Sequence, residues 1–149
     1  MSLLPLLRPS ALPLTRSFST SITAIGRRKT SQAKVTLTKL PEQEFWSEIR
    51  VNGKGMEDYF VRISDRDTLI SPLLKSSTLG LYSITASTRG GGTTGQVGAI
   101  RLGIARCLEK EGYRGDLKGE GFLTRDGRRV ERKKPGKPKA RASKQWVKR

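Results

Sequence analysis

Three glycines in the stretch STRGGGTTGQVGAIR have a spacing that could bind a nucleotide. Gly90, Gly92 and Gly95 match G-x-G-x-x-G, whose glycines allow a tight turn and let a pyrophosphate approach a helix N-terminus. That fingerprint needs an acidic residue about 20 positions later, at the end of a second strand. The acidic residues at that distance lie in KEGYRGDLKGEG, which is typical of turn and short helix. A Walker A loop also fails, because Gln96 and Val97 replace its lysine and hydroxyl residue. The sequence argues against a nucleotide cofactor and leaves a plain strand-to-helix turn as an alternative.

Residue types exclude much of ordinary catalytic chemistry. Histidine is absent, so histidine-activated nucleophiles and histidine metal sites are excluded. The single cysteine, Cys107, can complete neither a zinc site nor an internal disulfide, which suits a reducing compartment. We expect no enzyme activity, no catalytic residue, no cofactor and no metal, and a core position for Cys107.

The net charge of +17 is concentrated at the two ends of the 149 residues. Residues 1–40 hold seven Lys or Arg and no acidic residue, residues 41–123 hold eleven of each sign, and residues 124–149 hold twelve bases and two acids. A balanced middle is typical of one globular domain, whereas such basic ends favour a polyanion, above all nucleic acid. A solvated charge run is the plain alternative.

Residues 1–25 have the composition of an organelle transit peptide, with arginines, hydroxyl residues and leucines and no acidic residue. Arg16, Phe18 and Ser21 resemble the Arg-x-Phe-x-x-Ser arrangement of mitochondrial presequences that are cut twice, which would leave Gly26 as the mature N-terminus. Prolines and an arginine interrupt the apolar run, so we predict neither a secretory signal nor a span of ~20 apolar residues. A disordered basic arm is the alternative, and a plastid is the rival destination.

Residues 124–149 are predicted to form an extended basic tail. Val130, Trp146 and Val147 are its only sizeable apolar residues, too few to offset an ordering cost of ~1–2 kcal/mol per residue. At ~3.3 Å per residue the tail could reach about 85 Å from its domain. We expect it to become ordered only on an RNA surface.

The segment between the ends, residues 26–123, is expected to form the globular domain. Alternating apolar residues predict strands that include residues 33–37, 49–51 and 82–86. Asn52-Gly53 is a turn signal directly after the second of them.

Helices are predicted at residues 56–60, 65–76, 94–111 and 116–122, the third with an apolar stripe of Val97, Ile100, Ile104 and Leu108 and a C-cap at Gly112. Gly95, Ala99 and Gly103 recur every fourth residue on this helix. Because an interior glycine costs roughly 1 kcal/mol against alanine, this bare strip indicates that a sheet or another backbone comes close. Short strands and helices together predict an α+β fold, with a mixed sheet and helices on one face.

Three ordered stretches resemble small-subunit ribosomal protein nine in its bacterial and organellar form. They are GRRKTSQAKV, GGGTTGQVGAIRLGIARCL and GFLTRDGRRVERKKPGKPKAR, and the resemblance covers about residues 25–149. It implies a ribosomal-protein-five-domain-two-like fold with a left-handed β-α-β crossover. It also implies a structural role in the head of the small ribosomal subunit, in the mitochondrial matrix. The implied partners are small-subunit ribosomal RNA, peptidyl-site tRNA and neighbouring head proteins, with no membrane and no small-molecule substrate.

The resemblance also implies which residues bind RNA. Those expected to contact ribosomal RNA are Arg27, Arg28, Lys29, Arg89, Gly90, Gly91, Gly92, Arg125, Arg128, Arg129, Arg132, Lys133, Lys134, Lys137, Lys139 and Arg141, and those expected to contact tRNA are Lys148 and Arg149. The glycines would then bring backbone amides and a helix N-terminus to an RNA phosphate. The family pattern of Gln-Phe-Ser is replaced by Gln145, Trp146 and Val147, which puts one polar contact in doubt. The stretch 40–48 is longer than the usual turn and is expected to touch an organelle-specific neighbour.

Two other classes of protein are open at this stage. A free organellar RNA- or DNA-binding protein would have the same charge. A phosphate-transferring enzyme is conceivable because some small-molecule kinases share the implied fold, although a lysine-bearing phosphate loop is missing.

Overall fold

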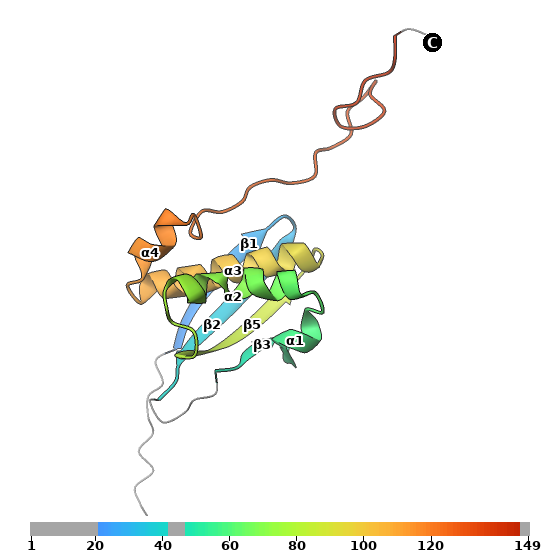
Figure 1. Ribbon diagram of the computed structural model, residues 1–149. Coiled ribbons are helices and arrows are strands. Elements are labelled where there is room, and N and C mark those ends of the chain that lie inside the picture. Colours follow the sequence, from blue (N-terminus) through green and yellow to red (C-terminus); the bar gives the residue numbers. More distant parts are fainter. Residues whose placement is uncertain (1–20, 42–46, 147–149) are drawn as a thin grey trace, which may run out of the picture.

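A five-stranded sheet and four helices make up the computed structural model, which describes residues 21–41 and 47–146 (Figure 1). The strands are β1 (Ser21–Arg28), β2 (Ser31–Lys39), β3 (Ile49–Val51), β4 (Lys54–Gly55) and β5 (Tyr82–Arg89), in the order β1-β2-β5-β3-β4. All neighbouring pairs are antiparallel except β3 and β5, which are parallel. The predicted mixed sheet is confirmed.

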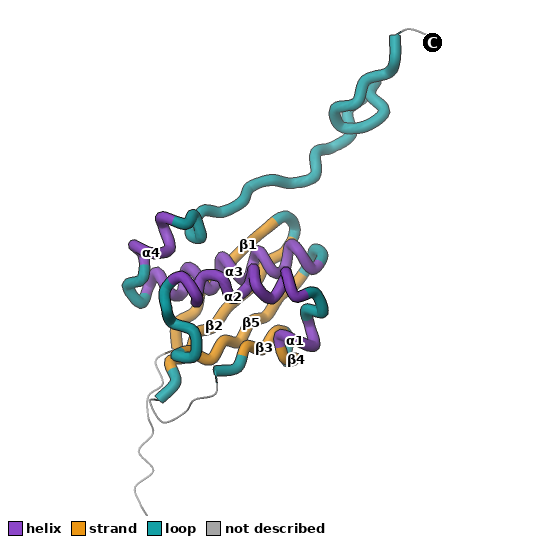
Figure 2. The backbone as a smooth tube through the Cα atoms, in the orientation of Figure 1, coloured by secondary structure: helices purple, strands orange, loops and turns teal. Residues whose placement is uncertain are grey.

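The helices lie on one face of the sheet, as predicted (Figures 1 and 2). They are α1 (Met56–Tyr59), α2 (Ile63–Lys75), α3 (Thr93–Lys110) and α4 (Arg114–Gly119). The long helix α3 packs on β1 and β2, and α2 packs on α3. The first three agree with the predicted helices within two residues at each end, whereas the last begins two residues before the predicted start and ends three before the predicted end.

The connection from β3 to β5 contains α1 and α2 and joins two parallel strands. This is the β-α-β unit whose left-handed crossover the resemblance implies, and its hand stays a prediction. The turn after β3 has the predicted geometry, with left-handed φ angles of 51° at Asn52 and 81° at Gly53. Such angles at both central residues match the twist of a tight hairpin.

Strand β1 was not predicted. It pairs with β2 along its whole length, from Ser21 opposite Thr38 to Arg28 opposite Ser31. Residues 21–25, which the sequence analysis assigned to the transit peptide, therefore lie in the sheet, and the expected boundary at Gly26 falls inside a strand. The alternation was hard to see because two of the inward residues of β1 are only Ala24 and Gly26. The rest of the predicted transit peptide, residues 1–20, lies outside the described residues.

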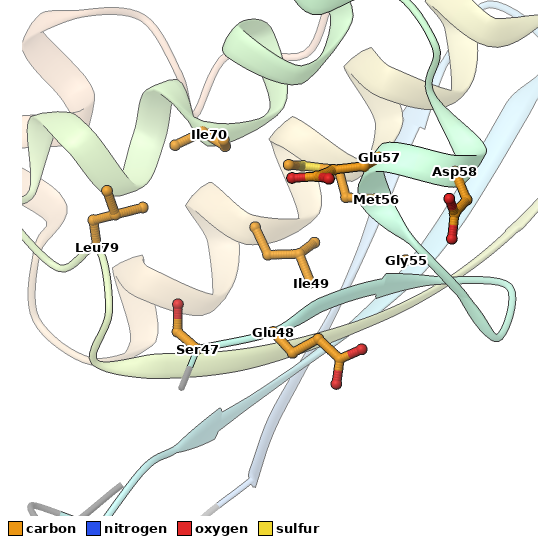
Figure 3. A pocket seen from close by; sticks show the side chains of 9 residues that line it. All are labelled: Ser47, Glu48, Ile49, Gly55, Met56, Glu57, Asp58, Ile70 and Leu79. Atoms are coloured by element: carbon orange, nitrogen blue, oxygen red, sulfur yellow. The ribbon is translucent and has the colours of Figure 1, made fainter. Parts of the chain in front are cut away.

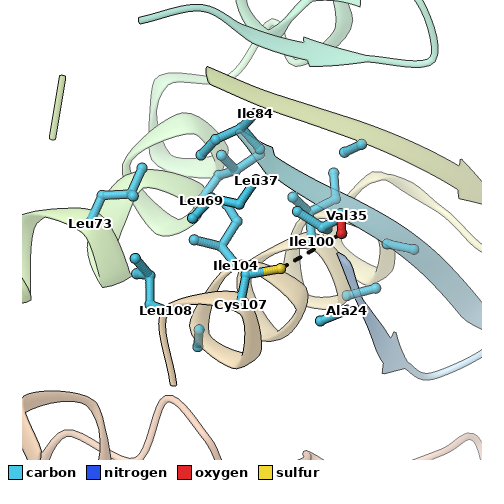
Figure 4. Close-up of a cluster of buried hydrophobic side chains, with 14 of the residues drawn as sticks. Ala24, Val35, Leu37, Leu69, Leu73, Ile84, Ile100, Ile104, Cys107 and Leu108 are labelled. Atoms are coloured by element: carbon cyan, nitrogen blue, oxygen red, sulfur yellow. Dashed lines mark hydrogen bonds between the residues drawn. The ribbon is translucent and has the colours of Figure 1, made fainter. Parts of the chain in front are cut away.

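The core lies between the sheet and α3 (Figure 4). The predicted stripe of α3 is buried there, together with the predicted inward residues of β2. Cys107 is fully buried, as expected, and its Sγ lies 3.6 Å from the carbonyl oxygen of Val35. Burial raises the pKa of the Cys107 thiol to about 11, because the thiolate would lose its hydration.

Helix α3 and the sheet approach each other closely along the predicted bare strip. A methyl group at Gly26 of β1 would overlap the carbonyl oxygen of Ala99 and come within 2.7 Å of the Gly103 amide nitrogen. A methyl group at Gly103 would lie 2.5 Å from Cγ2 of Val35. The small residues therefore allow the helix backbone to touch the strand backbone, which confirms the prediction.

Residues 124–146 belong to no helix or strand and lead away from the sheet (Figure 1). The side chains of Val130 and Trp146 are each 97% exposed, so they add nothing to the core. Within the described ranges, no helix combines the length and apolar character that crossing a membrane would require.

Candidate nucleic-acid interface

Three segments that are distant in sequence meet near the N-terminal end of α3. They are the turn between β1 and β2 (residues 28–31), the glycine loop (residues 89–92) and the root of the tail (residues 124–130). All three were expected to contain RNA-binding residues. The structure brings the parts of one predicted site together.

The glycine loop packs against the turn between β1 and β2. The hydroxyl of Ser31 donates a hydrogen bond of 3.0 Å to the carbonyl oxygen of Gly90. Gly90 and Gly91 have φ angles of 73° and 66°, in the left-handed region that favours glycine. A methyl group at Gly91 would overlap the Ser31 hydroxyl oxygen and lie 3.1 Å from that of Thr30. These two glycines are therefore needed for backbone shape and for close packing of the loop.

The N-terminus of α3 follows this loop and is open to solvent. Residues 92–94 are exposed, the helix has no hydrogen bond from a capping side chain, and its first turn has no acidic residue. The first amide groups of a helix have no partner within the helix and carry part of the positive end of its dipole. They can bind an anion such as a phosphate. This geometry is compatible with the expected role of the glycine loop.

Arg28 crosses from β1 to the root of the tail. Its side chain lies over Gly98 of α3, where a methyl group would overlap Cδ and come within 2.8 Å of Nη1. Its Nη2 lies 3.3 Å from Oδ2 of Asp126. The Nε atoms of Arg28 and Arg101 are both buried and find no acceptor among the described residues. Two guanidinium N–H groups at this place are thus left without a hydrogen-bond acceptor, although buried donors usually have one.

Asp126 fixes the root of the tail to this place. One of its oxygens accepts hydrogen bonds from the amide of Arg128 at 3.0 Å and from the Nε of Arg128 at 3.1 Å. These hydrogen bonds, with the nearby charge of Arg28, hold the pKa of Asp126 well below its usual range. We call Arg28, Arg101 and Arg128 with Asp126 the arginine cluster. Its three guanidinium groups face one carboxylate, so it keeps an excess of positive charge.

Arg101 of α3 was not predicted as a site residue. Burial, and then the charge of Arg28, lowers the pKa of Arg101. Its guanidinium lies 5.6 Å from the ring centroid of Phe122, within the range of a cation–π contact. Asp126 was also missed, although Asp126-Gly127 is a turn signal in which the carboxylate bonds a backbone amide two residues on.

The other predicted residues divide into two sets. Two shallow grooves beside the turn and the tail root gather Arg27, Lys29, Arg125 and Arg129 with members of the cluster. Further along the tail, Arg132, Lys133, Lys134, Lys137, Lys139 and Arg141 are exposed and are not gathered at the cluster. Arg141 instead donates from Nε to Glu131 at 3.0 Å. Lys148 and Arg149 lie outside the described residues.

A separate hollow lies between β3, α1 and α2 (Figure 3). Its wall contains Ile49, Met56, Ile70 and Leu79 together with three acidic residues, and no Lys or Arg among the residues that the structure describes there. This hollow is therefore unsuited to a polyanion. Ser47 and Glu48 of the stretch 40–48 line this hollow, whereas residues 42–46 fall outside the described residues, so the expected neighbour contact of that stretch stays a prediction.

Two kinds of site considered in the sequence, for a metal and for a nucleotide, depend on acidic clusters and on the glycine loop. The described ranges contain no group of three or more His, Cys, Asp or Glu side chains that could hold a metal ion. Gly90 and Gly91 pack against the turn between β1 and β2, so the part of the described glycine loop and helix that an anion could approach is the exposed N-terminus of α3.

Comparison with known proteins gives a consistent result. A profile of the ribosomal protein S9/S16 family matches residues 26–149. The chain is 50% identical to the small ribosomal subunit protein uS9m of Arabidopsis thaliana, over 83% of the chain and 28% of that protein. It is 48% identical to uS9m of Eremothecium gossypii, over 85% of the chain and 44% of that protein.

A bacterial relative matches over almost its whole length. The small ribosomal subunit protein uS9 of Dehalococcoides mccartyi is 42% identical, over 88% of the chain and 97% of that protein. The chain thus spans less than half of the two mitochondrial relatives but nearly all of the bacterial one. Because the family profile covers β2 to β5, all four helices, the arginine cluster and the tail, the chain belongs to the ribosomal protein S9/S16 family.

Proposed function

We propose that this chain is a structural constituent of the small subunit of the mitochondrial ribosome, bound to ribosomal RNA in the subunit head. Family membership, the names of the mitochondrial relatives and the targeting composition of the first residues support this proposal. Because the family is a structural one, the chain is not an enzyme, and the phosphate-transferring alternative is dropped.

The observation that carries the RNA-binding part is the arginine cluster. Two of its buried guanidinium N–H groups have no acceptor in the described part of the chain. The exposed guanidinium of Arg128 could bond a phosphate oxygen at the edge of the cluster, and the exposed α3 N-terminus could hold a second phosphate nearby. The expected ribosomal RNA residues of the turn, the glycine loop and the tail root would then act as one site. The remaining basic residues of the tail would follow the RNA backbone, as arginine forks and lysine point charges do.

The C-terminal end has a separate proposed partner. Lys148 and Arg149 would contact peptidyl-site tRNA and steady it without chemistry. Deleting these two residues should leave subunit assembly intact and weaken tRNA retention by purified small subunits. Normal retention would contradict the assignment.

Targeting to the mitochondrion is also proposed, with the plastid as the rival. Since residues 21–25 form part of β1, we place the targeting information within residues 1–20. A fluorescent protein fused after residue 20 should accumulate in mitochondria. Accumulation in plastids would reassign the organelle.

Sedimentation of the tagged full chain tests the function itself. It should travel with small ribosomal subunits at moderate salt, whereas a free RNA- or DNA-binding protein would not. The double variant Arg28→Gln, Arg128→Gln removes two groups of the arginine cluster and should reduce the co-sedimenting fraction. Its matched control is Arg62→Gln, Arg114→Gln, which removes the same charge from exposed positions away from the cluster. Equal loss in both variants would argue against a localised site.

A further inference from the structure

The face of the sheet that points away from α2 and α3 is open. Strand alternation puts eleven polar residues and one isoleucine there. Each of them is exposed or half-buried: Thr23, Ile25, Arg27, Gln32, Lys34, Thr36, Thr38, Arg50, Ser83, Thr85, Ser87 and Arg89. None of the four described helices covers them. We call this set the open sheet face.

The charge on the open sheet face has one sign. No acidic residue occurs in β1, β2, β3 or β5. Arg27, Lys34 and Arg89 form no ion pair with any described residue, whereas Arg50 is paired at 2.7 Å with Glu48, which precedes β3. A sheet face that only meets water usually mixes opposite charges across its strands. Arg27 and Lys34 belong to residues 1–40, which hold no acidic residue, and the acidic residues of 41–123 lie outside β3 and β5. The open sheet face is therefore left cationic.

The strand register arranges these side chains in a shallow lattice. Arg27, Gln32 and Arg89 form one row across three strands, and Ile25, Lys34 and Ser87 form the next. Neighbouring strands lie about 4.8 Å apart, and alternate residues along a strand about 7 Å apart. Beyond these rows the face consists mainly of Ser and Thr, whose short side chains let a partner approach the sheet closely.

The open sheet face continues into the site already described. Arg27 and Gln32 also line the groove that contains Arg125 and Arg129 of the tail root. A polyanion that lies in this groove would therefore also contact the row of Arg27, Gln32 and Arg89, so the positive surface is continuous from the tail root to the sheet.

We propose that the open sheet face binds the sugar–phosphate backbone of folded ribosomal RNA, as a second contact beside the arginine cluster and the tail. This inference rests on the proposed function. Arg and Lys would neutralise phosphates, and the Ser and Thr hydroxyls would bond phosphate or 2′-hydroxyl oxygens. A protein partner fits less well, because Ile25, at 45% exposure, is the one large apolar side chain among the twelve members of this face.

Directed hydroxyl-radical probing tests the placement. Cys107 is buried, so a cysteine introduced at an exposed position offers the accessible thiol for an iron chelate. Ser87→Cys puts the probe on the open sheet face, and Ser64→Cys puts it on the exposed side of α2 as a matched control. In complexes with purified small-subunit ribosomal RNA, position 87 should give strong RNA cleavage and position 64 little or none. Retained binding with no cleavage from position 87 would overturn the inference.

A charge reversal measures how much the open sheet face contributes to RNA affinity. Lys34→Glu should weaken binding of the same RNA by about tenfold and lower the slope of log K against log salt by about one. Lys118→Glu makes the same change on α4 and should leave both quantities nearly unchanged. Equal effects of the two reversals would overturn the inference, because only net charge would then matter. If the unmodified chain fails to bind ribosomal RNA, the proposed function itself is wrong. If the chain binds RNA but Lys34→Glu has no more effect than Lys118→Glu, only the inference about the open sheet face is wrong.

Discussion

Replacing Gly26 by alanine tests whether the contact between α3 and β1 controls the fold. The added methyl group would meet the carbonyl oxygen of Ala99 and the amide nitrogen of Gly103, both backbone atoms of α3. A flexible side chain could turn away, but helix backbone cannot move without separating α3 from the sheet.

The expected cost follows from this rigidity. Overpacking of a core typically costs about 1–3 kcal/mol, and overlap with backbone rather than side-chain atoms puts Gly26→Ala at the upper end, about 3 kcal/mol. For a domain of this size, 1 kcal/mol shifts the melting temperature by roughly 3–5 °C. We therefore expect Tm to fall by about 10–15 °C.

Thermal unfolding followed by circular dichroism measures this change in the full chain. The matched control is Gly119→Ala in α4, where a methyl group meets nothing within 4 Å. Alanine is the better helix former by roughly 1 kcal/mol, so this control should leave Tm unchanged or raise it slightly. A Tm for Gly26→Ala within about 2 °C of the unmodified chain would refute the close-contact reasoning.

Four further predictions test other parts of the structure. Burial raises the pKa of the Cys107 thiol from 9.0 to about 11, so the buried neutral thiol stabilises the fold fully below pH 9, and this stabilisation is lost as pH rises towards 11. Between pH 9 and 11 the Tm of the unmodified chain should therefore fall more than the Tm of Cys107→Ala. Asp126→Asn should speed tryptic cleavage at the tail root several-fold, because the carboxylate that holds the root is lost. Glu131→Gln, which releases only the outer tail, should not change this rate. Equal rates for the two variants would contradict an anchored root. A chain that lacks the first 20 residues should keep its Tm, while one that lacks the first 25 should lose several degrees, because it loses most of β1; equal values would show that those five residues add nothing. Gly98→Ala should displace the side chain of Arg28 and weaken ribosomal RNA binding without lowering Tm, and unchanged affinity would argue against that position of Arg28.

The sequence predicts the elements that have strong local signals. Period-two alternation located β2 and β5, the stripe of α3 was correct, and the bare strip indicated the close approach to the sheet. β1 was missed because two of its inward residues are only Ala24 and Gly26 and its composition is that of a targeting segment. β1 forms because it pairs with β2 and packs against α3, and local sequence propensity carries no information on such tertiary contacts.

The candidate site was predicted in composition but not in arrangement. Its basic residues followed from charge density and family resemblance. Asp126 and Arg101 were missed because their importance arises only when the tail root returns to α3, more than twenty residues after the helix begins. An isolated carboxylate in a basic tail has no local signal beyond the Asp-Gly turn.

The glycines of α3 connect the fold and the site by two different constraints. Gly103, like Gly26 opposite it, leaves room for backbone or core, so its replacement should act on stability. Gly98 leaves room for the side chain of Arg28, which can move elsewhere at little cost in stability but then leaves the arginine cluster. Small residues of α3 therefore have two separate roles. Gly103 sets the distance between the helix and the sheet, and Gly98 sets the position of the Arg28 guanidinium. It follows that glycine content alone, which first suggested a nucleotide loop, cannot separate the two uses: the atom that each missing side chain would meet decides between them.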